Sequence, residues 1–112
     1  MSDDRKSEIV LVYCPCPSTA EAERLGSALI DNRLAGCINI IPGMISIYRW
    51  EGKRERSEEA VLLVKTSSER TADVRSFLER EHPYDVPAIL VVPLAEVNRA
   101  YADWLHQEMN DG

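Results

Sequence analysis

The sequence predicts an α+β fold in which two helices cover one face of a four-stranded antiparallel sheet. Three observations predict it. The chain has 112 residues, 45% hydrophobic and 29% charged, a composition typical of one globular domain. Its apolar segments follow the order strand, helix, strand, strand, helix, strand, with a further helix at the end. A short hairpin signal joins the second and third strands. We expect one domain over residues 8–109 and a flexible N-terminal tail over residues 1–7.

The first strand and first helix are predicted from two different periodicities. Residues 8–14, EIVLVYC, are largely apolar in both alternating sets, which is typical of a central strand covered on both faces. Ser18 and Glu21 then have the spacing of a capping box, which indicates a helix N-terminus. Apolar and small residues follow at helical spacing: Ala22, Leu25, Gly26 and Leu29. The sequence therefore predicts a helix over residues 19–32.

The middle of the chain predicts a long hairpin. Two β-rich runs, around 38–41 and 45–50, are joined at Pro42-Gly43, where proline removes a ladder donor and glycine permits a bulge or bend. They form one long bent strand or two short ones. The EGK that follows Trp50 is typical of a hairpin turn, and AVLLVKT from Ala60 is the returning strand.

The last third of the chain predicts a helix, a strand and a second helix. A helix over 71–81 ends at His82-Pro83, because the residue before a proline is pushed out of the α region. The apolar run 88–94 is predicted as the fourth strand. Asn98 can cap the final helix. On one face of that helix we expect the apolar residues Tyr101, Trp104 and Leu105, with Met109 one turn further.

This order of elements is that of the ferredoxin-like, split β-α-β arrangement, with one additional C-terminal helix. Such a fold leaves the second face of its sheet bare. The strands here are apolar on both sides, and the hairpin is longer than a domain of this size requires. We therefore expect oligomerisation to cover the remaining hydrophobic surface.

Charge and hydropathy exclude several classes of function. With 19 acidic and 13 basic residues the net charge is −6, which repels a phosphate backbone, so we expect no nucleic-acid partner. The one basic stretch, RWEGKRER, is interpreted as a solvated hairpin tip. No stretch approaches the roughly 18 to 20 apolar residues that span a bilayer, and the charged N-terminus MSDDRKSE lacks the apolar segment of a secretory signal. We expect a cytoplasmic protein without a membrane segment, with its three cysteines reduced.

The segment LVYCPCP, residues 11–17, holds the most suggestive motif. Cys14 and Cys16 are two residues apart, so in an extended strand both thiols point the same way, a workable geometry for a soft ion such as Cu(I). A disulfide at that spacing would be strained. The prolines at 15 and 17 are also common where a strand breaks into a loop. The two cysteines are therefore open to three interpretations: structural residues at a strand end, which we favour, a metal site, or a redox pair.

Other polar residues have simpler interpretations. Cys37 begins an apolar strand and is expected to be core. His82 could ligate a metal or take part in acid–base chemistry, but a loop histidine bonded to backbone is favoured. His106 is expected at the surface of the last helix. Glu58 and Glu59 are adjacent on a strand and point to opposite faces, so we interpret them as solvated charge.

No catalytic motif accompanies these residues. The chain contains no phosphate-cradling glycine loop, no G-x-S-x-G and no H-E-x-x-H. Neither a serine nor a cysteine has a signalled base partner. We therefore expect a protein that binds or senses, and not an enzyme.

Four separated segments are similar to one known family. The stretches RLAGCINIIPGMISIYRWEGK, EEAVLLVKTS, HPYDVPAILVVPL and NRAYADWL resemble, in order and spacing, the divalent-cation-tolerance protein CutA family. The resemblance covers residues 8 to about 108. It implies a ferredoxin-like subunit in a homotrimer, whose long second and third strands pair across subunits, and a role in tolerance of copper and other divalent metals.

The resemblance also implies a place for a metal. Copper ligands proposed in the family are a cysteine that ends the first strand, a histidine just before HPY and a glutamate just after the second proline. Cys14 fits the first position, whereas Glu81 and Ala88 occupy the other two. Cys14, Cys16, Glu81 and His82 remain near that place. They form the predicted metal site if the end of the first strand lies near the loop before the fourth.

Three functions therefore follow as alternatives. The first is a trimeric protein of the metal response that binds copper or a similar ion. The second is a small-molecule sensor, because trimers of the PII signalling type have this architecture and bind ligands between subunits. The third is a trimeric scaffold for another protein.

Overall fold

The computed structural model describes residues 8–110; the predicted tail at 1–7 and residues 111–112 lie outside the described part. The elements are β1 (Ile9–Cys16), α1 (Thr19–Asp31), β2 (Cys37–Trp50), β3 (Lys53–Ser67), the 3-10 turn η1 (Ser68–Arg70), α2 (Thr71–Glu81), β4 (Leu90–Pro93) and α3 (Arg99–Asn110). The strands form one antiparallel sheet in the order β2-β3-β1-β4. The α+β, ferredoxin-like prediction is confirmed.

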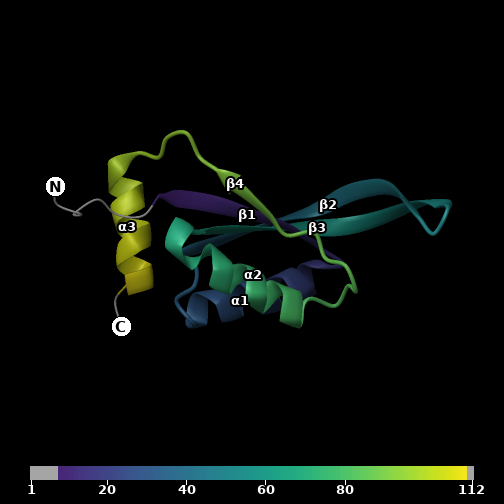
Figure 1. Cartoon of the computed structure of the whole chain (residues 1–112), viewed down its shortest axis with the longest axis horizontal. Coiled ribbons are helices and arrows are strands. Elements are labelled where there is room, and N and C mark those ends of the chain that lie inside the picture. The colour runs from purple at the N-terminus through teal and green to yellow at the C-terminus, as the bar shows by residue number, and fades with distance from the viewer. Residues whose placement is uncertain (1–7, 111–112) are drawn as a thin grey trace.

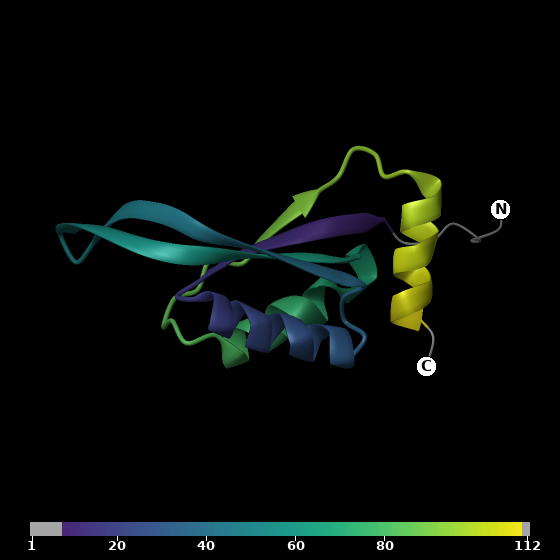
Figure 2. The ribbon, with the colours of Figure 1, turned by 180° about the vertical axis from the view of Figure 1, so that it is seen from behind.

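Helices α1 and α2 lie together on one face of the sheet, and neither view shows a helix on the other face (Figures 1 and 2). The main core lies between these layers. Its side chains alternate along β1 and β3, with Val12, Cys14 and Cys16 on β1 facing helix residues such as Leu25 and Leu78. Because successive strand residues point to opposite faces, Leu11, Tyr13 and Pro15 lie on the open face and are only partly buried.

The hairpin of β2 and β3 extends far beyond the layered body (Figure 1). Strand β1 pairs with β3 only from Ala60 to Ser67, so the remaining arm is a two-stranded ribbon. The register of β2 against β3 shifts between Ile41 and Met44, where Gly43 has φ +80°, so β2 is one strand with a bulge. At the tip, Glu51 and Gly52 both have positive φ, which is the conformation of a type I′ turn.

The helix termini follow the predicted signals. Ser18 Oγ accepts the backbone N–H of Glu21 at 3.2 Å, which caps α1. The Glu21 carboxylate bonds to Arg24 on its own helix, at 2.9 Å from Nη2. Helix α2 ends at Glu81, and His82 is extended, as the following proline requires.

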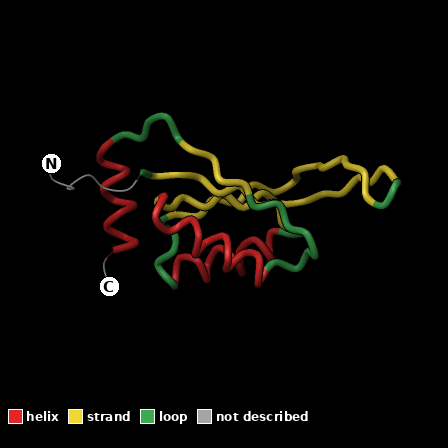
Figure 3. The backbone as a smooth tube through the Cα atoms, in the orientation of Figure 1, coloured by secondary structure: helices red, strands yellow, loops and turns green. Residues whose placement is uncertain are grey.

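Helix α3 lies at the end of the sheet opposite the hairpin tip (Figures 1 and 3). It contributes Leu105 and Met109 to a second small core with Ile9. Trp104 is 44% exposed and stacks on Tyr101.

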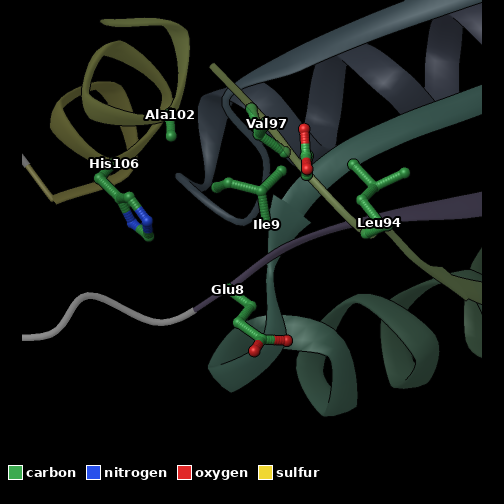
Figure 4. Close-up of a pocket in the computed structure, with 8 residues that line it drawn as sticks. Glu8, Ile9, Leu94, Val97, Ala102 and His106 are labelled. Carbon is green, nitrogen blue, oxygen red and sulfur yellow. The ribbon is translucent and has the colours of Figure 1, made fainter. Parts of the chain in front are cut away.

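One prediction for this helix was wrong: His106 is buried and not at the surface. It lies one turn after Ala102 on the helix face turned toward β1. Together they line a cavity of about 260 Å³ with Ile9 and Leu94 (Figure 4). Its sequence neighbours Gln107 and Glu108 are exposed. The polar composition around His106 therefore predicted the wrong helix face for this side chain.

Candidate functional site

The predicted strand end at Cys14 was wrong, because β1 pairs with β3 as far as Cys16 opposite Ala60. Proline is tolerated inside this central strand for a local reason. Strand β4 pairs with β1 only up to Tyr13, so the side of Pro15 that lacks an N–H faces no strand. The carbonyl of Pro15 accepts a hydrogen bond from His82 Nε2 there, at 2.8 Å.

The structure brings Cys14, Cys16 and His82 together. One ligand atom from each lies within 4.8 Å of the others, and all three residues are buried. The two thiols point to the same face of β1, as their spacing predicts. His82 reaches them from the loop that follows α2, so segments far apart in the sequence meet at the end of β1. Among residues 8–110 this is the only group of three or more such side chains that could hold a metal ion.

Both ring nitrogens of His82 have backbone partners. Nδ1 accepts the N–H of Tyr84 at 3.1 Å, so the proton lies on Nε2, which donates to the Pro15 carbonyl. This confirms the favoured interpretation of a loop histidine bonded to backbone. A metal ion bound through this ring would replace one of the two hydrogen bonds.

The two thiols influence each other's ionisation. A hydrogen bond between them, with burial and the charge of Cys16 in addition, raises the pKa of Cys14. The same hydrogen bond lowers the pKa of Cys16, against the opposing effect of burial. The pair therefore loses a first proton more readily than a second, as expected for two close acids. The structure has all three cysteines as free thiols, with Cys37 partly buried in the second core.

Glu81 lies outside the group of three. Its carboxylate faces the surface, 3.6 Å from Arg24 Nη1 and 3.4 Å from Arg80 Nε. Its side chain is 39% exposed. Ion pairs with two arginines keep this carboxylate away from the thiols.

Sequence reasoning missed a second polar feature on the open face of the sheet. Glu59, interpreted as solvated, is 9% exposed, and its Oε2 accepts the hydroxyl hydrogen of Tyr84 at 2.7 Å. Burial, followed by the bond to Glu59, raises the pKa of Tyr84. Both side chains line a cavity of about 740 Å³ that extends from Pro15 along the hairpin arm as far as Trp50. The alternation along β3 could have shown that Glu59 shares a face with Val61 and Leu63.

The sequence matches the family of CutA1 divalent ion tolerance proteins over residues 10–108. The chain belongs to that family. The protein named divalent-cation tolerance protein CutA of Thermus thermophilus is 43% identical over 89% of this chain and 95% of its own length. The protein of that name from Pectobacterium atrosepticum is 36% identical over 97% and 99%.

Solved structures agree. CutA1 of Ehrlichia chaffeensis has a TM-score of 0.90 at 27% identity, covering 94% of this chain and 98% of its own. A protein from Archaeoglobus fulgidus, described as a periplasmic divalent cation tolerance protein CutA, has a TM-score of 0.88 at 35% identity, covering 91% and 99%. The predicted CutA resemblance is thus confirmed. Within residues 8–110, no helix is long and apolar enough to cross a membrane.

Proposed function

We propose that this CutA-family chain acts in the response to metal ions by binding a soft ion, Cu(I) above all, through Cys14, Cys16 and His82. The observation that carries the proposal is the convergence of two buried thiols and an imidazole within 4.8 Å. The role is binding, by sequestration or sensing, without chemistry on a substrate.

The donor set favours a soft metal. Thiolates select Cu(I) over hard cations such as Mg²⁺ or Ca²⁺, which prefer oxygen ligands. Cys14 and Cys16 are the main ligands in this proposal, because His82 must release a backbone hydrogen bond before it binds. Glu81 takes no part, since its carboxylate is held by arginines. Ala88, at the position of the family's proposed glutamate ligand, offers no ligand atom.

A titration of the reduced protein with Cu(I) against a competing chelator tests this proposal. We expect one ion per chain, with the affinity reduced at least tenfold in Cys14→Ser and in Cys16→Ser. Cys37→Ser is the matched control and keeps the affinity, because its thiol lies in the second core. His82→Gln should weaken binding less than either cysteine variant. Equal affinity in the wild type and both cysteine variants would refute the site.

We also propose that the chain forms a homotrimer, as its family resemblance implies. Large apolar side chains are exposed along the hairpin arm and on β4: Ile41, Ile45, Ile47, Tyr48, Trp50, Leu90, Val91 and Val92. The four residues of β4 form an edge strand and are exposed throughout. A soluble monomer rarely leaves such a surface uncovered.

Light scattering tests the assembly. The expected mass is three times the 12.6 kDa of one chain. Ile47→Asp, on the arm, should reduce this mass, whereas Ile30→Asp, an exposed isoleucine on α1, should not. A mass of one chain at micromolar concentration contradicts the proposal.

A cytoplasmic location is proposed from the cysteines. Three free thiols, two of them buried, are typical of a reducing compartment. The Archaeoglobus relative is described as periplasmic, so location needs its own test. Cell fractionation with compartment markers provides it, and recovery in the periplasmic fraction would contradict the proposal.

A further inference from the structure

We propose that Tyr84 is a positioning residue of the metal site, which controls whether the His82 ring can bind a metal ion. Its backbone N–H occupies the lone pair of that ring, so His82 becomes a ligand only when the loop around Tyr84 is released. This inference rests on the proposed binding at Cys14 and Cys16. The loop joins α2 to β4, and His82 contacts the end of β1 from it (Figure 3).

The hydrogen bonds of His82 fix the position of its ring proton. Nδ1 accepts the Tyr84 N–H at 3.1 Å, and Nε2 donates to the Pro15 carbonyl at 2.8 Å. A neutral imidazole has one N–H and one nitrogen with a free lone pair, and it binds a metal ion through that lone pair. In this ring the lone pair belongs to Nδ1, and the Tyr84 N–H already occupies it.

Binding of a metal ion through either ring nitrogen breaks the bond from Tyr84. If Nδ1 is the ligand, its lone pair is no longer available to the Tyr84 N–H. If Nε2 is the ligand, the single proton of the neutral ring moves to Nδ1, where it faces a second donor. Nε2 lies on the side of Cys14, whose Sγ is 4.0 Å from the same Pro15 carbonyl oxygen. Ligation through Nε2 therefore breaks the bond to Pro15 as well.

Tyr84 is also held by its side chain. Its hydroxyl donates to Glu59 Oε2 at 2.7 Å, and its ring packs on the His82 ring with 4.8 Å between the centroids. Because the two rings are in contact, a new orientation of the imidazole displaces the phenol, and we expect the bond to Glu59 to be lost with the bond to His82. The hydroxyl bond thus stabilises the state in which His82 is not a ligand, and it opposes metal binding.

The two arrangements of the His82 ring form a discrete switch. Cys14 and Cys16 lie on the helix side of the sheet, whereas Pro15, Glu59 and Tyr84 line the cavity on the other side. A ligand that binds only one of two states also increases the population of that state. Occupation of the thiols together with His82 therefore changes the structure of the opposite face of the sheet.

Competition for Cu(I) between the reduced protein and a chelator tests the opposing bond. Tyr84→Phe should bind Cu(I) at least fivefold more tightly than the wild type, because release of the loop no longer breaks a hydroxyl bond. Tyr101→Phe is the matched control. Its hydroxyl also has a partner, Lys65 Nζ at 3.0 Å, but it belongs to α3 and packs in the second core near Ile9, at the other end of β1. Its Cu(I) affinity should be unchanged.

The same substitution in a His82→Gln background separates positioning of the ring from a general effect on the fold. In that background Tyr84→Phe should leave the Cu(I) affinity unchanged, because no imidazole has to be released. An equal gain in both backgrounds, or no gain in the wild-type background, would overturn the proposal.

NMR of the wild-type chain is a second test that needs no substitution at Tyr84. The chain has two histidines, so isotope-labelled histidine gives two sets of ring signals, and His82→Gln assigns them. Without metal the His82 proton should lie on Nε2. Cu(I) at one equivalent should shift one ring nitrogen of His82 and make the Tyr84 amide exchange with solvent at least tenfold faster.

The outcomes distinguish this proposal from the metal site itself. Stoichiometric binding of Cu(I) with unchanged His82 signals and unchanged Tyr84 exchange would overturn the switch and leave the two thiols as the ligands. Absence of Cu(I) binding in the titration would overturn both the metal site and the switch.

Discussion

The hydrogen bond between Tyr84 and Glu59 offers the sharpest test of the structure. Tyr84→Phe removes only the hydroxyl that lies 2.7 Å from Glu59 Oε2. A hydrogen bond to a charged group contributes about 1.5–3 kcal/mol, and here its loss leaves a nine-tenths buried carboxylate without a donor. We expect the free energy of unfolding at pH 7 to fall by about 2 kcal/mol.

The pH dependence of this effect has a definite sign. Burial and the bond to Glu59 raise the pKa of Tyr84 above its ordinary value of 10.0. A raised pKa in the folded state means that the stabilisation is fully present below pH 10 and decreases as the pH rises further. The difference between wild type and Tyr84→Phe should therefore be constant from pH 7 to about 9.5 and then decrease.

Urea denaturation at one fixed protein concentration measures both effects, because the stability of an oligomer depends on concentration. Glu23→Gln is the control: this residue is exposed on α1, and a surface change of this kind stays within about 0.5 kcal/mol. A loss below about 0.5 kcal/mol in Tyr84→Phe, or a difference that does not change with pH, would refute the reasoning.

Three further predictions concern other parts of the chain. A Cβ on Gly36 would lie 2.8 Å from Leu105 Cδ2 and 3.1 Å from its carbonyl oxygen, so Gly36→Ala should destabilise the fold by about 1–3 kcal/mol in urea denaturation; no loss would show that α3 shifts freely. Glu51 has φ +50° before Gly52, and Asn-Gly suits this turn better, so Glu51→Asn should raise the free energy of unfolding by about 0.5 kcal/mol, whereas a decrease contradicts the turn assignment. The pKa of Cys14 is raised, so its thiol is protonated at neutral pH and must lose that proton when it binds a metal. The Cu(I) affinity measured by chelator competition should therefore increase between pH 6 and 9, and a pH-independent affinity would exclude the thiols as ligands.

The sequence predicted the elements well where one local signal dominates. Helix α2 begins and ends at the predicted residues, and α1 is capped by Ser18 as expected. The errors came where tertiary context decides. Pro15 looked like a strand breaker, because only the sheet order shows that its N–H side faces no strand. His106 looked exposed, because only the position of α3 at the end of the sheet places it beside Ile9 and Leu94.

The candidate site could be predicted in part for the same reason. The C-x-C spacing places two thiols on one face of a strand, which is a local property of β structure. His82 and Tyr84 join that region only through the fold, which places the α2–β4 loop beside the end of β1. Glu59 was misjudged because its partner, Tyr84, is 25 residues away in sequence.

One stretch of backbone connects the thiols to the cavity that Glu59 and Tyr84 line. The flanking thiols, Cys14 and Cys16, face the helices, while Pro15 lines that cavity on the other face of the sheet. The Pro15 carbonyl accepts from His82, whose other nitrogen accepts the N–H of Tyr84, and the Tyr84 hydroxyl donates to Glu59. These three hydrogen bonds, together with the body of Tyr84, join Pro15 to Glu59. A metal ion that displaced either bond of His82 would disturb the loop that holds Tyr84.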